Sequence, residues 1–185
     1  MLGSRLRVPA FDRKLLQGGI VHIGVGAFNR AHQAVYLDDL LHRNDTERWG
    51  ECGLGLRPAD RQAQQVLRSQ DFLYTAVEQS AERLEARVVG CLCDFLLAPE
   101  NPEAAIEKMA SPECRIVGLT ITEAGYLFDG VTGIFEDQHP DVLHDLANPQ
   151  SPRSFLGYVT EALNRRRICG LPPFTVMSCD NLPGN

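Results

Sequence analysis

The chain has 185 residues, of which 44% are hydrophobic and 23% are charged, so it is long and apolar enough to fold as one domain with its own core. Its formal net charge of −6 argues against a nucleic-acid partner, because proteins that bind the phosphate backbone normally present a basic face. There is no signal-peptide pattern and no apolar run of about 18 residues, so we expect neither secretion nor contact with a membrane.

Short apolar runs alternate with longer helical patterns along the chain. The first half is predicted to contain, in order, a strand over 20–23, a helix from Ala27 to Leu41, a strand over 52–56, a helix from Pro58 to about Leu67, and two strands over 72–77 and 84–89 that form a hairpin. The second half is predicted to contain a helix over 102–109, a strand over 115–120, a loop over 125–138, helices over 140–146 and 154–167, and a strand over 174–177. Strands that alternate with helices pair in parallel and carry helices on both faces. The predicted fold class is therefore α/β, a doubly wound, mostly parallel Rossmann-type sheet with a hairpin insertion.

A strand, a tight glycine turn and the start of a helix follow one another near the N-terminus. Gly24 lets the chain turn sharply, and Gly26 lets the backbone approach a diphosphate, toward which the helix directs free N–H groups. Asn29 stands where a third glycine usually follows, so an ordinary glycine turn is the alternative. The residues predicted to bind a dinucleotide cofactor here are Ile23, Gly24, Val25, Gly26, Ala27, Phe28, Asn29 and Arg30.

An acidic residue follows the second predicted strand. NAD-binding folds use a carboxylate near this place to accept hydrogen bonds from the ribose hydroxyls, and Asp60 is the candidate. Asp60 also suits the first turn of its own helix, where negative charge is favourable. Arg57 beside it would instead favour a 2′-phosphate. We therefore predict NAD as the cofactor, with NADP as the alternative.

The six cysteines lie mostly inside or beside apolar runs. This placement is typical of unpaired thiols in a reducing compartment, so we predict a cytoplasmic protein. A zinc site at Cys91 and Cys93, two residues apart on a strand, would also need a distant histidine, and Cys179 has no evident histidine partner. We therefore predict neither a metal site nor a cysteine nucleophile. His22 lies within a strand, and we predict a structural role for it.

Polar residues follow two of the later strands. Glu123 and Gly125 follow the strand over 115–120, and Asp180 and Asn181 follow the last strand. Ligands of open α/β sheets bind beyond the carboxyl ends of the strands, so both segments are candidate parts of a site. A solvated loop and a simple turn are the respective alternatives. The amide of Asn181 is suited to donate a hydrogen bond to a substrate oxygen.

The segment 21–33 resembles the opening motif of the mannitol 2-dehydrogenase family. These are long-chain, zinc-independent polyol dehydrogenases, and the group includes fructuronate reductases and arabinitol dehydrogenases. Segments 53–57, 119–126 and 173–181 also resemble family segments and follow in the family's order, so the resemblance covers nearly the whole chain. Asn29 is a departure, because many relatives have histidine there.

The resemblance implies an NAD(H)-dependent oxidoreductase that interconverts a polyol and a ketose, such as mannitol and fructose or mannonate and fructuronate. It implies that the segment from Gly24 to Arg30 cradles the diphosphate of NAD and that Asp60 binds the ribose. It places Glu123 near the entrance of the active site, beside the cofactor. Asn181 is implied to be catalytic, as one of two amides that polarise the substrate oxygen.

In this family a lysine in a second, helical domain takes the proton from the alcohol. This sequence contains only Lys14 and Lys108, and neither follows the carboxyl end of a predicted strand. The resemblance therefore implies that residues 1–185 are an N-terminal dinucleotide-binding domain that is inactive alone. Its expected partners are its own C-terminal domain and a small polyol or keto-sugar. A non-catalytic nucleotide-binding or regulatory module is the alternative, and a Rossmann-like domain used for assembly is another.

Overall fold

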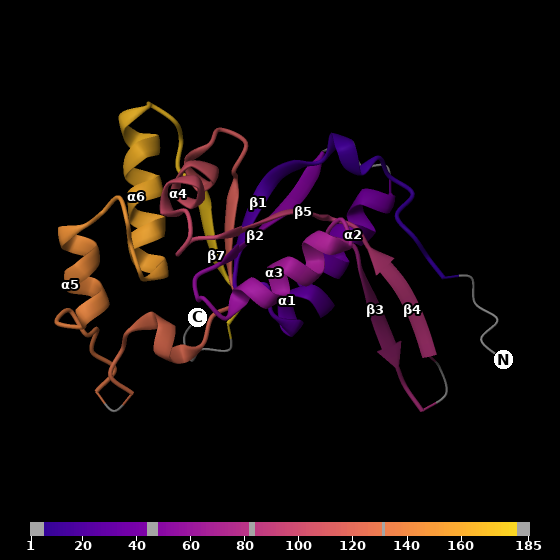
Figure 1. Ribbon diagram of the computed structural model, residues 1–185, viewed down its shortest axis with the longest axis horizontal. Helices are drawn as coiled ribbons and strands as arrows, with labels where there is room; N and C mark the ends of the chain where they lie inside the picture. The colour runs from indigo at the N-terminus through magenta and orange to yellow at the C-terminus, as the bar shows by residue number, and fades with distance from the viewer. Residues whose placement is uncertain (1–5, 44–47, 82–83, 131, 181–185) are drawn as a thin grey trace.

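The computed structural model describes residues 6–43, 48–81, 84–130 and 132–180 (Figure 1). The strands in these ranges are β1 (Gln17–Ile23), β2 (Trp49–Gly55), β3 (Tyr74–Gln79), β4 (Leu84–Val89), β5 (Leu92–Leu97), β6 (Ile116–Leu119) and β7 (Thr175–Ser178). The α-helices are α1 (Ala27–Ala31), α2 (Gln33–His42), α3 (Asp60–Ser69), α4 (Pro102–Ala110), α5 (Pro140–Ala147) and α6 (Phe155–Ile168). Two short 3-10 helices are η1 (Arg13–Leu15) and η2 (Glu123–Tyr126).

Five strands form a parallel sheet in the order β5-β2-β1-β6-β7. The central strand β1 has Ile20 level with Glu51 of β2 on one side and with Ile116 of β6 on the other. The chain builds outward from β1 through β2 and β5, then returns to build outward the other way through β6 and β7. Such a reversal leaves a crevice at the carboxyl ends of the strands beside β1. The predicted α/β doubly wound sheet is confirmed.

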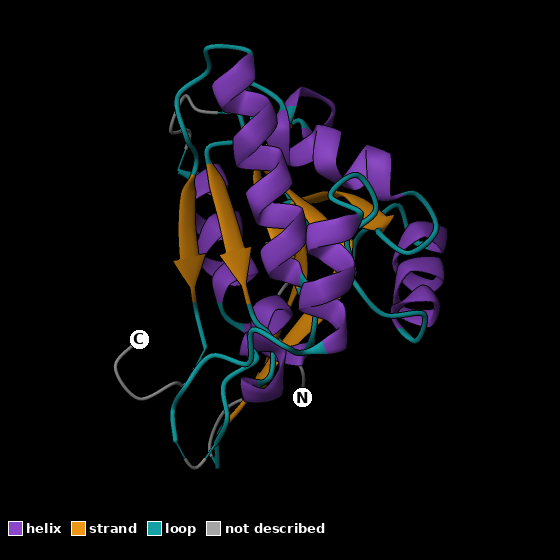
Figure 2. Cartoon of the chain, turned by 90° about the vertical axis from the view of Figure 1, so that its left-hand side faces the viewer, coloured by secondary structure: helices purple, strands orange, loops and turns teal. Residues whose placement is uncertain are grey.

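Helices cover both faces of this sheet, and Figure 2 shows the strands between them. α1, α2 and α3 pack on one face, and α4 and α6 pack on the other. β1 and β2 are buried on both faces along nearly their whole length, which is typical of parallel strands in the middle of an α/β sheet. The side chains that face α4 and α6 from the three central strands are Val21, Ile23, Cys52, Leu54, Val117 and Leu119.

The predicted hairpin is present as β3 and β4. These strands are antiparallel, with Tyr74 opposite Val89 and Gln79 opposite Leu84. They form a separate two-stranded sheet that extends away from the main sheet, below α2 in Figure 1. The hydroxyl of Tyr74 donates a hydrogen bond of 2.7 Å to the carbonyl of Arg30, which links the hairpin to α1.

Two parts of the chain differ from the predicted elements. β5 is an edge strand of the main sheet, a position that the sequence pattern of residues 92–97 does not reveal. The helix predicted from Ala27 to Leu41 is broken at His32, whose backbone has φ −127° and ψ −85°. Apolar periodicity continues across this break, so the pattern alone does not reveal it. The break leaves α1 as a separate helix of five residues.

Candidate functional site

A cavity of about 390 Å³ lies at the carboxyl ends of β1, β2 and β6. Ile23 and Gly24 line it from the end of β1, Asp60 from the start of α3, and Thr120 from the end of β6. Residues of the segments after β6 and before α6 complete its wall. This is the place where open α/β sheets bind their ligands.

The turn that leaves β1 requires glycine at Gly24. Its φ is +94°, its N–H donates a hydrogen bond of 3.1 Å to the carbonyl of Leu54, and a Cβ there would collide with the carbonyl of Thr120. Gly26 differs, because its φ is −85° and a Cβ there would meet no atom closer than 3.9 Å, the carbonyl oxygen of Gly24. The fold therefore explains Gly24, while Gly26 leaves space above the backbone that a ligand can approach closely.

The helix that follows this turn starts without a side-chain cap. α1 begins after Gly26, which as the N-cap residue has no side chain to bond the first N–H groups. The side chains of Val25 and Asn29 are buried in the fold, and Phe28 is exposed and stacks on His32 with ring centroids 5.0 Å apart. Of the predicted segment from Ile23 to Arg30, the structure thus brings Ile23 and Gly24 to the cavity itself.

Asp60 lies where a ribose-binding carboxylate is expected. It begins α3, lines the cavity, and its side chain is 21% exposed. Its carboxylate accepts hydrogen bonds from the backbone N–H of Arg57 at 3.0 Å and from the guanidinium of Arg57 at 3.3 Å. The guanidinium of Arg57 is itself largely exposed, with 75% of the side chain accessible. The carboxylate is therefore held in place at the cavity wall while retaining access to it.

Two predicted site residues are less closely tied to the cavity. Glu123 is exposed at the start of η2, and its neighbours Thr122 and Ala124 line the cavity while Glu123 does not. Asn181 lies outside the described residues. The roles of both remain predictions.

A group of polar side chains at the ends of β6 and β7 was not predicted as a unit. The hydroxyl of Tyr126 donates to the carboxylate of Asp180 at 2.5 Å and lies 2.8 Å from the hydroxyl of Ser178. The other oxygen of Asp180 accepts from the N–H of Ile121 at 2.8 Å. Burial and the bond to Asp180 raise the pKa of Tyr126 to about 12, so its proton stays in place. These bonds fix the exit of β7 against the loop after β6.

His22 stabilises the glycine turn from inside the sheet. It is fully buried, and its Nε2 lies 2.8 Å from the hydroxyl of Thr120, which donates to the carbonyl of Gly24 at 2.5 Å. Because the single hydroxyl proton is used in that bond, Nε2 must be the protonated ring nitrogen. Burial lowers the pKa of His22 to about 4, so the ring is neutral at physiological pH. The structure thus gives His22 a role in shaping the turn.

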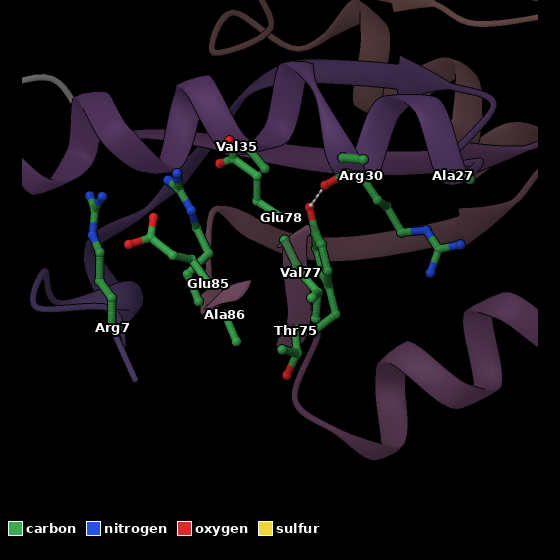
Figure 3. Close-up of a pocket in the computed structure, with 13 residues that line it drawn as sticks. Arg7, Ala27, Arg30, Val35, Thr75, Val77, Glu78, Glu85 and Ala86 are labelled. Carbon is green, nitrogen blue, oxygen red and sulfur yellow. Dashed lines mark hydrogen bonds between the residues drawn. The ribbon is translucent and has the colours of Figure 1, made fainter. Parts of the chain in front are cut away.

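A larger cavity of about 550 Å³ lies elsewhere, between α1, α2 and the hairpin of β3 and β4 (Figure 3). Arg7, Arg30 and Arg87 are its cationic residues. Arg7 and Arg87 are both paired with Asp39, at 2.7 and 2.8 Å, and the Nε of Arg30 donates to the carbonyl of Gly26 at 3.2 Å. Since these cations are already engaged, the smaller cavity at the strand ends is the better candidate site.

Two structural features are absent from the described residues. Within those ranges, no helix has the length and apolar character needed to cross a bilayer. In the same part of the chain, no three or more His, Cys, Asp or Glu side chains gather in a way suited to a metal ion.

Comparison with known proteins finds relatives that match nearly the whole of this chain. Residues 18–185 match the family model described as the mannitol dehydrogenase Rossmann domain. Mannitol 2-dehydrogenase of Pyricularia oryzae is 48% identical over 182 residues, covering 97% of this chain and 36% of that protein. Mannitol 2-dehydrogenase of Cereibacter sphaeroides is 49% identical over 177 residues, covering 96% and 37%.

Solved structures agree with this similarity. The ternary complex of Pseudomonas fluorescens mannitol 2-dehydrogenase with NAD and D-mannitol matches with a TM-score of 0.91 and 48% identity, over 96% of this chain and 36% of that chain. A D-sorbitol dehydrogenase in substrate-free form matches with a TM-score of 0.88 and 42% identity, over 96% and 37%. The chain thus spans a little over a third of the length of these relatives.

Replacing each of the two glycines of the turn with alanine is expected to change stability by different amounts. Gly24→Ala is expected to lower the free energy of unfolding by about 2 kcal/mol or more, because it combines a positive φ with a collision against Thr120. Gly26→Ala is expected to change it by less than about 1 kcal/mol, since the added methyl group meets open space. Urea denaturation followed by circular dichroism measures both. Equal losses in the two variants would contradict the distinction.

Proposed function

This chain belongs to the mannitol dehydrogenase family, and we propose that it is the NAD(H)-binding part of an oxidoreductase that interconverts a polyol and a ketose. Within that class we propose D-mannitol and fructose as the pair, because the relatives are mannitol 2-dehydrogenases and one was solved with D-mannitol. The fructuronate and mannonate pair has no such support. The observation that carries the proposal is the turn from Gly24 to Gly26, which leaves open space beside the strand-end cavity.

The residues present fit NAD. The backbone N–H groups at the start of α1 would hold the diphosphate, because Gly26 has no side chain and leaves open space there. Asp60 accepts hydrogen bonds from the adenosine ribose, and its negative charge disfavours a 2′-phosphate. We propose that Glu123 acts at the entrance of the active site and that Asn181 donates a hydrogen bond to the substrate oxygen. Bound NAD supplies the acceptor for the hydride of the alcohol.

Oxidation of the alcohol needs a base that accepts its proton. Neither of the two lysines among the described residues is placed to act as that base. Lys14 belongs to η1, which precedes β1. Lys108 of α4 reaches Gly18, near the start of β1, where its Nζ would lie 2.8 Å from an added Cβ. Both therefore lie toward the amino end of the sheet, away from the cavity. We propose that residues 1–185 form a dinucleotide-binding domain and that a lysine of a second, helical domain accepts the proton.

Cofactor binding is tested first at Gly26. We expect NADH to bind the unmodified chain and Gly26→Ala to weaken that binding by at least about tenfold, because the methyl group occupies the space of the diphosphate. Titration followed by the fluorescence of NADH gives both dissociation constants. Gly130→Ala is the matched control, since its Cβ also meets open space, away from the cavity, and binding should stay within about twofold. No binding to the unmodified chain at millimolar NADH would refute the proposal.

The role of Asp60 is tested by comparing two cofactors. Asp60→Asn is expected to weaken binding of NADH by about tenfold, because hydrogen bonds to a charged acceptor are lost, and to reduce the preference for NADH over NADPH. Asp141→Asn removes the same charge from the same cavity and should leave that preference unchanged. If both variants shift the preference equally, the effect comes from net charge rather than from a contact with the ribose.

The position of the lysines predicts binding without turnover. Supplied with D-mannitol and NAD, the 185-residue chain should form no NADH above background, because neither lysine lies at the strand ends. The Pseudomonas fluorescens enzyme, assayed alongside, is the positive control. Formation of fructose and NADH by the chain alone would show that one of its own groups accepts the proton.

A further inference from the structure

The short helix α1 depends on a single buried side chain. Among its five residues, all of them described, Asn29 alone is buried, and its surface is fully inaccessible. A helix of this length is not stable by itself, so contacts with the rest of the fold decide where it lies. The hydroxyl of Tyr74 supports its backbone at Arg30. The other contact that holds the helix in place is the one made by the buried side chain of Asn29.

That partner is Glu51 of β2, which is also fully buried. The amide Nδ2 of Asn29 donates to Oε2 of Glu51 at 3.4 Å. The second polar atom of each side chain, Oδ1 of Asn29 and Oε1 of Glu51, is buried and has no hydrogen-bond partner among the described residues. Glu51 forms no ion pair with a cationic side chain within the same ranges. A bare carboxylate in such a place is costly.

One added proton resolves all of these deficits. A protonated Glu51 gains an O–H donor, and Oδ1 of Asn29, on the side chain to which Glu51 is already bonded, is a buried acceptor without a partner among the described residues. An amide and a carboxylic acid joined in this way form two hydrogen bonds, and neither group carries a charge. Burial raises the pKa of Glu51 from 4.5 to about 7, and the bond from Asn29 opposes this only in part.

We propose that Glu51, in its protonated form, is a positioning residue that holds Asn29 and thereby keeps α1 and the glycine turn in place for the diphosphate of the cofactor. This inference rests on the proposed binding of NAD. Glu51 does not touch the cofactor, and it acts through Asn29. Two apolar side chains could also anchor the helix. The consequence of using a polar pair is that the anchor depends on the protonation of Glu51.

The direction of the pH effect follows from the pKa. The folded chain holds the proton of Glu51 more tightly than the unfolded chain does, so its anchoring contribution is lost as the pH rises through about 7. Above that pH the charged carboxylate favours arrangements in which water reaches it, and these displace α1. The affinity for NADH should fall accordingly.

The charges of other titratable groups around Glu51 must also be considered near pH 7. They belong to five neighbouring parts of the fold: His22 of β1, Asp38 of α2, Tyr74 of β3, Cys91 just before β5 with Cys93 in it, and Cys179 after β7. Burial raises the pKa of the phenol and of the three thiols, so these stay neutral near pH 7. The pKa of His22 is about 4, so it also stays neutral.

Asp38 provides a matched control. Burial raises the pKa of this carboxyl as well, but its Oδ1 accepts from the N–H of Gly90 at 2.8 Å and its Oδ2 lies 3.4 Å from His42, so it is not bonded to α1. His139 lines the cavity in which the cofactor is proposed to bind, so its replacement provides a second control at a position that is not bonded to α1.

The experiment measures the dissociation constant of NADH from about pH 6 to about pH 9, for the unmodified chain and for Glu51→Gln, Asp38→Asn and His139→Gln. We expect the unmodified chain to bind about tenfold more weakly at the upper pH. Glu51→Gln cannot ionise and still pairs with Asn29, so its affinity should change by less than about twofold over the range. Asp38→Asn and His139→Gln should keep the slope of the unmodified chain. A flat profile in the unmodified chain, or an unchanged slope in Glu51→Gln, would overturn the inference.

An infrared titration of the unmodified chain decides the matter if Glu51→Gln does not fold. A protonated carboxylic acid has a carbonyl band that a carboxylate lacks. We expect such a band near pH 6 that disappears as the pH rises through about 7, in parallel with the weakening of NADH binding. Absence of the band at the lower pH would overturn the inference. Failure of NADH to bind at any pH would refute the proposed function instead, and the infrared result would still report on the proton.

Discussion

The arrangement of the site depends on one close backbone approach, between Gly24 and the carbonyl of Thr120. It joins the end of β1 to the end of β6, and the carbonyl of Leu54 in β2 receives the N–H of Gly24. Three neighbouring strands therefore determine one turn, and the parallel register of the sheet decides where the cavity opens. His22 takes part through the hydroxyl of Thr120, so a buried neutral side chain shapes the site without facing a ligand.

In the same turn, the backbone faces the outer surface, while buried side chains hold it from the inner side. Gly24 and Gly26 keep the outer surface of the turn free of side chains, and the buried amide of Asn29 faces Glu51 beneath. A diphosphate bound above would meet N–H groups, while the groups that hold those N–H groups in place lie on the inner side. This layering explains how a five-residue helix can serve as a binding element, and why its buried anchor influences a ligand that it does not touch.

Under the proposed function, the domain orients the cofactor and leaves proton transfer to residues elsewhere. Asp60 is held by Arg57 at one side of the cavity. At the ends of β6 and β7, the bonds of Asp180 to Tyr126 and to Ile121 fix the segment that leads toward Asn181. Both lysines lie toward the opposite end of the sheet. Neither lysine of this chain therefore reaches the cavity, which agrees with the proposal that residues elsewhere accept the proton.

The sequence by itself determined the fold class, the glycine turn after β1 and the placement of Asp60 near the cavity, because apolar periodicity, glycine and chain order are local signals. It also indicated a hairpin, since the turn signal between its strands is local. Only the tertiary structure decided that the helical pattern breaks at His32, that residues 92–97 join the main sheet, and that Asn29 faces Glu51. These features depend on packing between segments distant in sequence. A buried glutamate without a cation is recognised only once its surroundings are known, because burial and pairing are properties of the whole fold.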